Sequence, residues 1–453
     1  MYNTSKSRLE NLACTKENIM EVIRKTVGPG VGLTAIRTEK FKSATLSVTF
    51  LVPLEEKTAS LNALIPYVLR RGCEKYPTMA QVSRRLEELY GGMLEPTVRR
   101  RGETQCVGMM GSFLGDAYTL EDRSNLKEAG SLLAQLILHP ATEAGGFRPE
   151  YVRGEKENLI QTIRGELNEK RQYAVLRLTQ EMCRGERYGV DRYGSEETVR
   201  AVTPESLWKQ YQTLLGKARV ELHYCGAEPV EKVEAALEEL ISGLRQGREG
   251  WEPGTTECQV VAAPPTGEPR RVVERLDVAQ GKLALGFRTG GITLGDKDYP
   301  ALMLCNTLYG GSGNSKLFLN VRERLSLCYY AGSMLESVKG LLVVSSGVEF
   351  GKLAEAEREI LAQLESVKAG NITDKELEGA RQILLSSYRG ILDSRGALEG
   401  YWLTAAVTGV LTPPEELLED IRRVTLREVA EAARKLRLDT VYQLVGKGVG
   451  ENG

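Results

Sequence analysis

Two stretches of the chain alternate apolar and polar residues with the period of a β-strand. They run from Ala44 to Phe50 and from Lys282 to Phe287, and this pattern predicts two β-strands. In each half of the chain, segments with helical spacing and then further strands follow the alternating stretch. Helices and strands in mixed order favour the α+β class, in which each domain is an antiparallel or mixed sheet with helices packed on it.

Several short phrases recur in the same order about 220 to 230 residues apart, as in a duplicated domain. The phrase Leu-Ala-Gln-Leu occupies residues 133–136 and again 361–364. Thr203 and Thr425 each stand where a helix N-cap belongs, and Pro204 takes the first helical position of the first copy. We therefore predict two homologous domains.

Two glycine-rich segments interrupt these patterns. Residues 245–270 are rich in glycine, proline and polar residues, which is typical of an exposed linker and places the domains at 1–244 and 271–453. Residues 309–316 follow an apolar helical segment rather than a strand, and they lack the spacing of a phosphate-binding loop. We expect this second segment to be a turn before a helix that begins near Lys316.

Composition and charge exclude some classes of function. The chain of 453 residues has 60 lysines and arginines against 61 aspartates and glutamates, so its net charge of −1 excludes a nucleic-acid binder that works by bulk positive charge. It has two histidines, His139 and His223, which lie far apart in the sequence. Zinc hydrolases usually take two or three imidazoles from their own chain. We interpret both histidines as structural or surface residues.

The cysteines and the N-terminal sequence point to a compartment. The eight cysteines, from Cys14 to Cys328, have no paired spacing that would predict a disulfide framework or a zinc knuckle, which favours a reducing environment. The first residues lack the basic segment and apolar core of a signal peptide, and no later stretch has the apolar length of a membrane span. We expect a cytoplasmic protein with neither membrane nor nucleic acid as a partner.

The first half carries a family resemblance. Residues Ser60–Gly72, followed by Leu86–Gly92, resemble the first-domain signature of the insulinase/pitrilysin zinc peptidases, whose inverted zinc motif is H-x-x-E-H. The resemblance implies a clamshell of two α+β halves. When the two patterns are aligned on Gly72, the histidine positions fall on Ala63 and Tyr67, and the glutamate position falls on Pro66. Both zinc-binding imidazoles and the general base are therefore replaced by side chains that cannot do this chemistry.

The family's remaining zinc ligand is a glutamate on a later helix, seven residues after another glutamate. In this chain Glu155 matches the earlier acid and Thr162 stands at the ligand position, with Glu157 and Glu166 close enough for a shifted alignment. One carboxylate without imidazole partners makes a poor zinc site. We therefore expect no metal ligands, no catalytic residues and no zinc cofactor in this chain.

The second half resembles another part of the same family. The stretch Leu317–Tyr330 and the glycine-rich run before it are similar to the family's second-domain phrase, in which a tyrosine follows an arginine by seven residues. These positions are Arg322 and Tyr329, and the resemblance implies that they bind the substrate backbone. A guanidinium with forked donors and a phenol with one donor suit a peptide carbonyl. The alternative is that Arg322 makes a surface ion pair and Tyr329 packs in the sheet.

Further segments resemble an intracellular bacterial branch of the family whose members lack zinc ligands, namely residues 170–174, 181–183 and 188–189. Within this family, mitochondrial processing peptidase pairs a catalytic subunit with a zinc-free one. The resemblance therefore implies that this chain is the non-catalytic, peptide-binding subunit of a heteromeric zinc endopeptidase. Its partners would be a zinc-bearing sister subunit or a homodimer mate, and an unfolded peptide. The alternatives are a peptide-binding scaffold without proteolysis, a metallopeptidase rebuilt on His139 and His223, and nucleotide binding through the glycine-rich loop.

Overall fold

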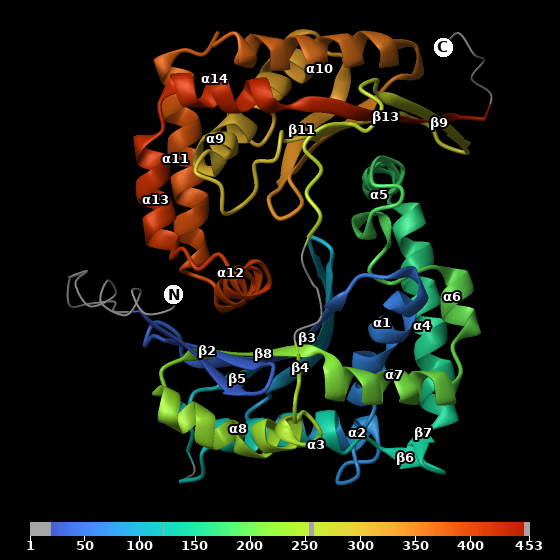
Figure 1. Cartoon of the computed structure of the whole chain (residues 1–453), viewed down its shortest axis with the longest axis vertical. Helices are drawn as coiled ribbons and strands as arrows, with labels where there is room; N and C mark the ends of the chain where they lie inside the picture. The colour runs from blue at the N-terminus through green and yellow to red at the C-terminus, as the bar shows by residue number, and fades with distance from the viewer. Residues whose placement is uncertain (1–19, 121, 253–257, 448–453) are drawn as a thin grey trace.

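The computed structural model describes residues 20–120, 122–252 and 258–447. Cys14, the N-terminal segment 1–19 and part of the predicted linker, 253–257, lie outside the described residues. The chain folds into two α+β halves that face each other as a clamshell (Figure 1).

The first half is built on a six-stranded mixed sheet with the strand order β1-β2-β8-β3-β5-β4. Strands β2 and β8 run parallel, and the other neighbouring strands run antiparallel. The strands are β1 (Glu21–Gly28), β2 (Val31–Arg37), β3 (Ser43–Pro53), β4 (Met93–Arg101), β5 (Thr104–Leu114) and β8 (Arg219–Gly226), with a separate small pair formed by β6 (Thr142–Glu143) and β7 (Gly146–Phe147). The helices are α1 (Glu56–Arg70), α2 (Met79–Glu88), η1 (Asp116–Tyr118), α3 (Asn125–Leu138), α4 (Pro149–Asn168), α5 (Lys170–Met182), η2 (Arg187–Gly189), α6 (Glu196–Ala201), α7 (Pro204–Lys217) and α8 (Val230–Arg245).

The second half repeats this plan with a five-stranded sheet in the order β11-β12-β10-β13-β9, in which β13 and β9 run parallel. Its strands are β9 (Arg270–Leu276), β10 (Gly281–Arg288), β11 (Cys328–Glu336), β12 (Leu341–Val348) and β13 (Arg437–Gly446). Its helices are α9 (Tyr299–Tyr309), the π-helix η3 (Leu317–Arg324), η4 (Phe350–Lys352), α10 (Leu353–Lys368), α11 (Asp374–Ile391), α12 (Arg395–Thr408), α13 (Pro414–Arg423) and α14 (Leu426–Lys435).

The local predictions of repeated elements are confirmed. The two alternating stretches lie in β3 and β10, whose alternate residues enter the two main cores. Thr203 caps α7 by accepting a hydrogen bond from the Ser206 backbone N–H at 3.2 Å, and Thr425 caps α14 in the same way through Glu428 at 3.3 Å. Because the cap satisfies backbone donors that the first helical turn leaves free, a threonine there marks the start of a helix from the sequence alone.

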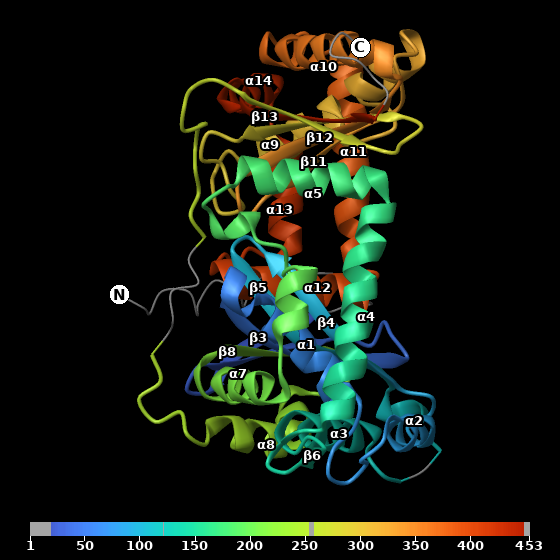
Figure 2. The same ribbon diagram turned by 90° about the vertical axis from the view of Figure 1, so that its right-hand side faces the viewer.

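Each sheet is also covered on its inner face by a helix from the opposite half (Figures 1 and 2). Helix α5 packs Tyr173 and Leu178 against Tyr442 of the second sheet. Helix α12 packs Trp402 against Cys225 of the first sheet, where Leu398 also lies. This exchange ties the two halves together, because neither inner face is buried by its own half.

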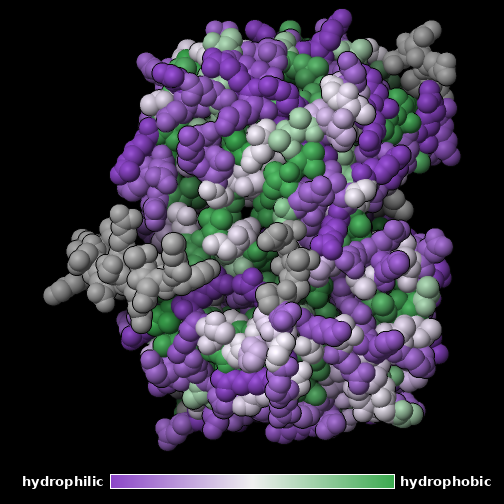
Figure 3. Space-filling view, in the orientation of Figure 1, coloured by the Kyte–Doolittle hydropathy of each residue, from purple (hydrophilic) through white to green (hydrophobic). Residues whose placement is uncertain are grey.

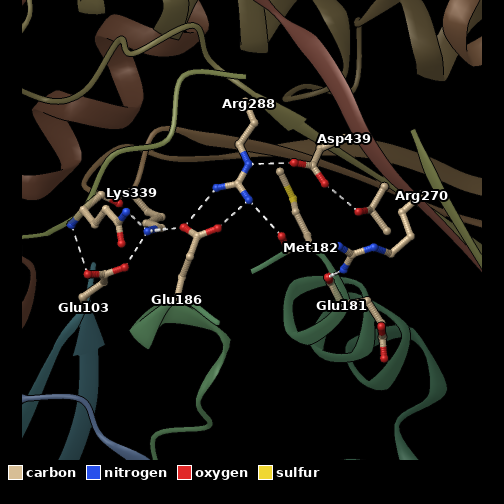
Figure 4. A network of polar contacts seen from close by, with 10 residues as sticks. Glu103, Glu181, Met182, Glu186, Arg270, Arg288, Lys339 and Asp439 are labelled. Carbon is tan, nitrogen blue, oxygen red and sulfur yellow. Dashed lines mark hydrogen bonds and ion pairs between the residues drawn. The ribbon is translucent and has the colours of Figure 1, made fainter. Parts of the chain in front are cut away.

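Buried ion pairs join the two halves beside the connecting segment (Figure 4). Lys339, between β11 and β12, is fully buried and lies 2.5 Å from Glu103 and 2.6 Å from Glu186. Arg288 on β10, also fully buried, lies 2.7 Å from Glu186 and 2.9 Å from Asp439. Burial by itself raises the pKa of Glu186, but hydrogen bonds from Arg288 and Lys339 outweigh burial and hold this pKa below its usual value. Glu103 and Glu186 belong to the first half, so the network crosses between the halves.

The connection between α8 and β9 departs from the expectation of an exposed linker. Arg248 is 1% exposed and donates hydrogen bonds to the backbone carbonyls of Leu215 (2.7 Å) and Ala218 (2.8 Å). A buried guanidinium needs such acceptors, and the carbonyls at the end of α7 supply them. The first residues of this connection are thus anchored to the first half, and the division at 245–270 stays a prediction.

Candidate functional site

Helix α1 carries the positions at which the family resemblance places the zinc motif. Ala63 and Pro66 are buried in the core, and Tyr67 is partly buried. Burial, followed by the neighbouring Tyr193, raises the pKa of Tyr67 to about 12. The phenol is therefore protonated at neutral pH, and none of the three side chains offers a lone pair suited to zinc.

Glu155 on α4, the acid that the resemblance retains, is already neutralised. Its side chain is 8% exposed, forms an ion pair with Arg71 at the end of α1, and accepts a hydrogen bond from Asn158 at 3.1 Å. Thr162, at the family's ligand position, is exposed and donates its hydroxyl proton to the Asn158 carbonyl at 3.1 Å. In the three described ranges, no three His, Cys, Asp or Glu side chains gather as a metal site. The residues at the family's zinc position do not fit the metal.

The acids that a shifted alignment would use do not change this result. Glu157 is exposed on α4. Glu166 accepts a hydrogen bond from Arg192 at 2.7 Å. Burial and then Asp191 raise the pKa of Glu166, although Arg192 opposes them. Each carboxylate therefore lacks the imidazole partners that a zinc site of this family requires.

The two histidines lie in unrelated places. His139 ends α3 as its exposed C-terminal cap residue. His223 lies in the middle of β8 and is 1% exposed. The interpretation of the pair as a surface and a structural residue is confirmed, and the two do not come together as a rebuilt metal site.

The glycine-rich loop is a turn between two helices, as predicted. It connects the end of α9 to η3, and Gly310 accepts a hydrogen bond from the Ser333 backbone N–H of β11 at 2.9 Å. Lys316, which a phosphate-binding loop would use to bind phosphate, lies 2.9 Å from Glu376. The loop therefore holds the edge of the second sheet, and its lysine is neutralised by that ion pair.

Arg322 and Tyr329 lie in a segment with three successive departures from regular backbone. Arg322 is on the π-helix η3, Ser326 has a left-handed φ of 49°, and Tyr329 occupies an irregularity in the pairing of β11 with β12. Such departures are frequent at functional sites, where they aim side chains away from regular directions.

The surroundings of Arg322 and Tyr329 bear on whether these residues are free to bind a substrate or are used by the fold. Tyr329 is 62% exposed, so it does not pack in the sheet. The Arg322 side chain is 42% exposed, lies 3.5 Å from the Glu323 carboxylate, and has its guanidinium carbon 4.8 Å from the centre of the Phe318 ring. Arg322 does form a surface ion pair, but the pair is to a sequence neighbour and leaves other donors open. Their role in substrate binding stays a prediction.

A cavity of about 740 Å³ lies between the two halves. Helix α5 forms one wall and strands β11 and β12 form another, while Gly310 and Gly311 of the glycine-rich loop also line it. In the space-filling view the surface is hollowed between the halves, and hydrophobic residues border this hollow (Figure 3). Arg322 and Tyr329 are not among the lining residues.

The cavity contains arginines that the sequence analysis did not select. Arg100 comes from β4, Arg171 from α5 and Arg192 from the loop before α6. Arg171 belongs to a charged helix whose sequence pattern is equally typical of a solvent-exposed face. Arg100 and Arg192 belong to no motif or periodic pattern in the sequence. The three arginines come together only in the fold, where β4, α5 and the loop before α6 line the same cavity.

Comparisons with known proteins agree on one family. Residues 201–384 match the family model described as Peptidase M16 inactive domain. A Bacillus subtilis protein named "Probable inactive metalloprotease YmfF" is 34% identical over 418 residues, which are 92% of this chain and 96% of that protein. A B. subtilis "Uncharacterized zinc protease YmxG" is 27% identical over 169 residues, 37% of this chain and 41% of its own length.

Solved structures show the same fold along 95% of the chain. A conserved protein from Enterococcus faecalis V583 superposes with a TM-score of 0.85 at 28% identity, covering 95% of this chain and all of that one. A peptidase M16 inactive domain from Pseudomonas fluorescens reaches a TM-score of 0.77 at 15% identity, with 95% of this chain and 99% of that one covered. The chain belongs to the M16 (insulinase/pitrilysin) peptidase family, as a homologue of its inactive metalloproteases.

Proposed function

We propose that this chain is the non-catalytic, peptide-binding subunit of a heteromeric zinc endopeptidase. The observation that supports this role most is a contrast between the halves. The first half has lost every zinc-binding side chain at the family's positions, whereas the second half keeps an exposed arginine and tyrosine on an irregular segment beside the cavity's glycine-rich loop. A sister subunit with an intact H-x-x-E-H motif would supply the zinc, and this chain would hold the peptide.

Arg322 and Tyr329 are the residues we assign to peptide binding. Both side chains are exposed, and the guanidinium and the phenol hydroxyl can donate hydrogen bonds to backbone carbonyls of an extended peptide. A substrate fixed in this way reaches a catalytic centre in the right orientation, which lowers the entropic part of the barrier. No step of bond cleavage is assigned to this chain.

The first experiment is to purify the tagged chain gently from its native cells and to quantify co-purifying chains by mass spectrometry. We expect a near-equal amount of an M16 chain with an intact H-x-x-E-H motif. If the chain purifies alone or only with itself, the heteromeric peptidase is the wrong account. A chain that purifies alone but binds peptides would be the scaffold of the alternative hypothesis.

The reconstituted pair then tests the assigned residues. We expect Arg322→Ala to lower kcat/KM for peptide hydrolysis by roughly tenfold, the loss of one charge-assisted hydrogen bond, mainly through KM. Arg324→Ala is the matched control, because Arg324 lies on the same π-helix with its side chain 62% exposed. If the two substitutions lower kcat/KM equally, Arg322 is not part of the peptide-binding site.

A further inference from the structure

Three arginines line the cavity between the halves, and each is stacked on a tyrosine. The guanidinium carbon lies 3.9 Å from the ring centre in Arg100–Tyr188, 4.3 Å in Arg171–Tyr330 and 4.4 Å in Arg192–Tyr193. These are the shortest distances between a cationic group and an aromatic ring in the part of the chain that the structure describes. The aromatic ring holds the plane of a guanidinium while its edge, with the N–H donors, stays available to a ligand.

Two of these arginines keep donors open. Arg192 donates to the Glu166 carboxylate at 2.7 Å, so its charge is compensated. Arg100 donates one hydrogen bond to the Tyr188 carbonyl at 2.9 Å, and Arg171 is held by its stacking on Tyr330. Within the described residues, no carboxylate forms an ion pair with the guanidinium of Arg100 or Arg171.

The stability of helix α5 does not explain why a cation stands at position 171. It lies in the first turn of α5, which contains no acidic residue, and the helix dipole there is unfavourable for positive charge. Glu169, before this turn, uses a carboxylate oxygen to accept the Arg171 backbone N–H at 3.1 Å. The Arg171 side chain is exposed and lines the cavity, and its charge does not stabilise the helix.

The other walls suit a chain rather than a small ion. Val175 and Leu176 of α5 face the cavity, as do Met334 and Val343 of the second sheet. Apolar side chains in a cavity of about 740 Å³ provide room and contact area for the side chains of a bound peptide. Glu166 and Glu169 also line the cavity, but Glu166 accepts from Arg192 and Glu169 accepts from the Arg171 backbone N–H, so arginines still outnumber carboxylates there. A site with two open guanidinium groups and apolar walls favours a ligand that has both carboxylates and apolar groups.

We infer that this cavity binds peptide segments that carry carboxylates, with Arg100 and Arg171 as the residues that select them. This inference rests on the proposed peptide-binding function and adds the class of peptide. Each guanidinium can donate two parallel hydrogen bonds to one carboxylate, which a neutral amide cannot match. The carboxylate can be that of an aspartate or glutamate side chain or of the peptide's C-terminus.

The test uses the full chain and fluorescent pools of short random peptides with one fixed central residue: glutamate, glutamine or lysine. We expect the glutamate pool to bind roughly tenfold more tightly than the glutamine pool, the effect of one charge-assisted hydrogen bond, and the preference to weaken at high salt. Amidated and free-acid versions of each pool distinguish side-chain carboxylates from the C-terminal one.

Substitutions assign the preference to residues. Arg171→Gln should abolish most of the glutamate preference, because it removes the guanidinium donors. The chain should still fold, since the substitution only takes an exposed cation away from a helix N-terminus. Arg100→Gln should add to the loss of preference. Arg171→Lys should restore only part of the preference, because an ammonium lacks the planar fork. Arg153→Gln is the matched control, since Arg153 is an exposed arginine of α4 outside the cavity lining.

The outcomes are distinguishable. If the amidated glutamate and glutamine pools bind equally and amidation also leaves the binding of the free-acid pools unchanged, or if the preference for a carboxylate survives both substitutions, the inference is overturned and the peptide-binding function stays intact. Tighter binding of the lysine pool overturns it as well. If no pool binds at all, the proposed peptide-binding function fails, and the inference fails with it.

Discussion

At the scale of single residues, His223 is a buried polar group without a protein partner. It lies on the face of β8 that α12 covers, opposite Ser47, and neither ring nitrogen has a hydrogen-bond partner among the described residues. Burial lowers the pKa of the imidazole, although Glu399 and Glu221 oppose this effect. An apolar side chain removes the desolvated nitrogens, so we expect His223→Leu to raise the free energy of unfolding by about 1 kcal/mol at neutral pH.

The same substitution should change the dependence on pH. The folded imidazole takes up a proton at lower pH than the unfolded one, so the wild-type chain loses stability as the pH falls below about 6.5. His223→Leu should lack this part of the loss, whereas His139→Leu, at an exposed histidine, should retain it. Urea unfolding at about pH 7.5 and about pH 5.5 measures both effects. An identical loss in wild type and His223→Leu would contradict the assignment.

At the scale of elements, one buried ion pair holds α12 on the first sheet. Arg99 of β4 donates hydrogen bonds to Glu399 at 2.6 and 2.8 Å, and Ser47 adds a third at 3.0 Å. Burial raises the pKa of Glu399, but the bonds from Arg99 outweigh it and the pKa lies below its usual value. Glu399→Gln leaves the Arg99 charge without its counter-ion, and we expect a loss of about 3 kcal/mol in the free energy of unfolding.

Equilibrium unfolding together with limited proteolysis of α12 measures this loss. Glu87→Gln, at an exposed glutamate of α2, is the control and should be neutral. The double variant Arg99→Met with Glu399→Leu should recover much of the stability, because it removes both charges from the interface. If Glu399→Gln lowers the free energy of unfolding no more than Glu87→Gln does, α12 is held by its apolar contacts alone.

At the scale of the whole molecule, we expect the network around Lys339 to stabilise the clamshell against acid. Because the pKa of Glu186 is lowered in the folded state, its contribution is present above about pH 4.5 and is lost as the pH falls through the folded-state value. Burial by itself lowers the pKa of Lys339, but the hydrogen bonds that its ammonium donates to Glu103 and Glu186 outweigh burial and raise this pKa, so its contribution is lost only at pH values above its usual range. We expect the halves to separate on acidification before the helices unfold.

Small-angle scattering and circular dichroism, recorded along the same acid titration, detect the two events separately. Lys339→Met leaves the buried Glu103 without its counter-ion and Glu186 with Arg288 alone, so it should lower the free energy of unfolding by about 3 kcal/mol and expand the molecule at neutral pH. Lys127→Met, at an exposed lysine of α3, should do neither. Loss of helix and expansion at the same pH would mean that the halves do not separate as units.

Local signals in the sequence predicted most elements but not their partners. A threonine cap at 203 or 425 acts on the helix that follows it, and alternation at 44–50 describes one strand, so each can be found without the fold. The exchange of α5 and α12 between the halves could not be found in this way. An amphipathic pattern shows that one face of a helix is buried, but it does not show which sheet covers that face.

The replacement of the family's zinc motif was determined by the sequence itself, since no packing can turn Ala63, Pro66 and Tyr67 into imidazoles and a carboxylate. The ion pairs of Lys339 and the stacked arginines of the cavity were decided only by the tertiary structure. Arg171 and Tyr330 are remote in the chain, and their contact exists only when α5 lies under the second sheet. Such contacts depend on distance in space, which a pattern along the chain does not encode.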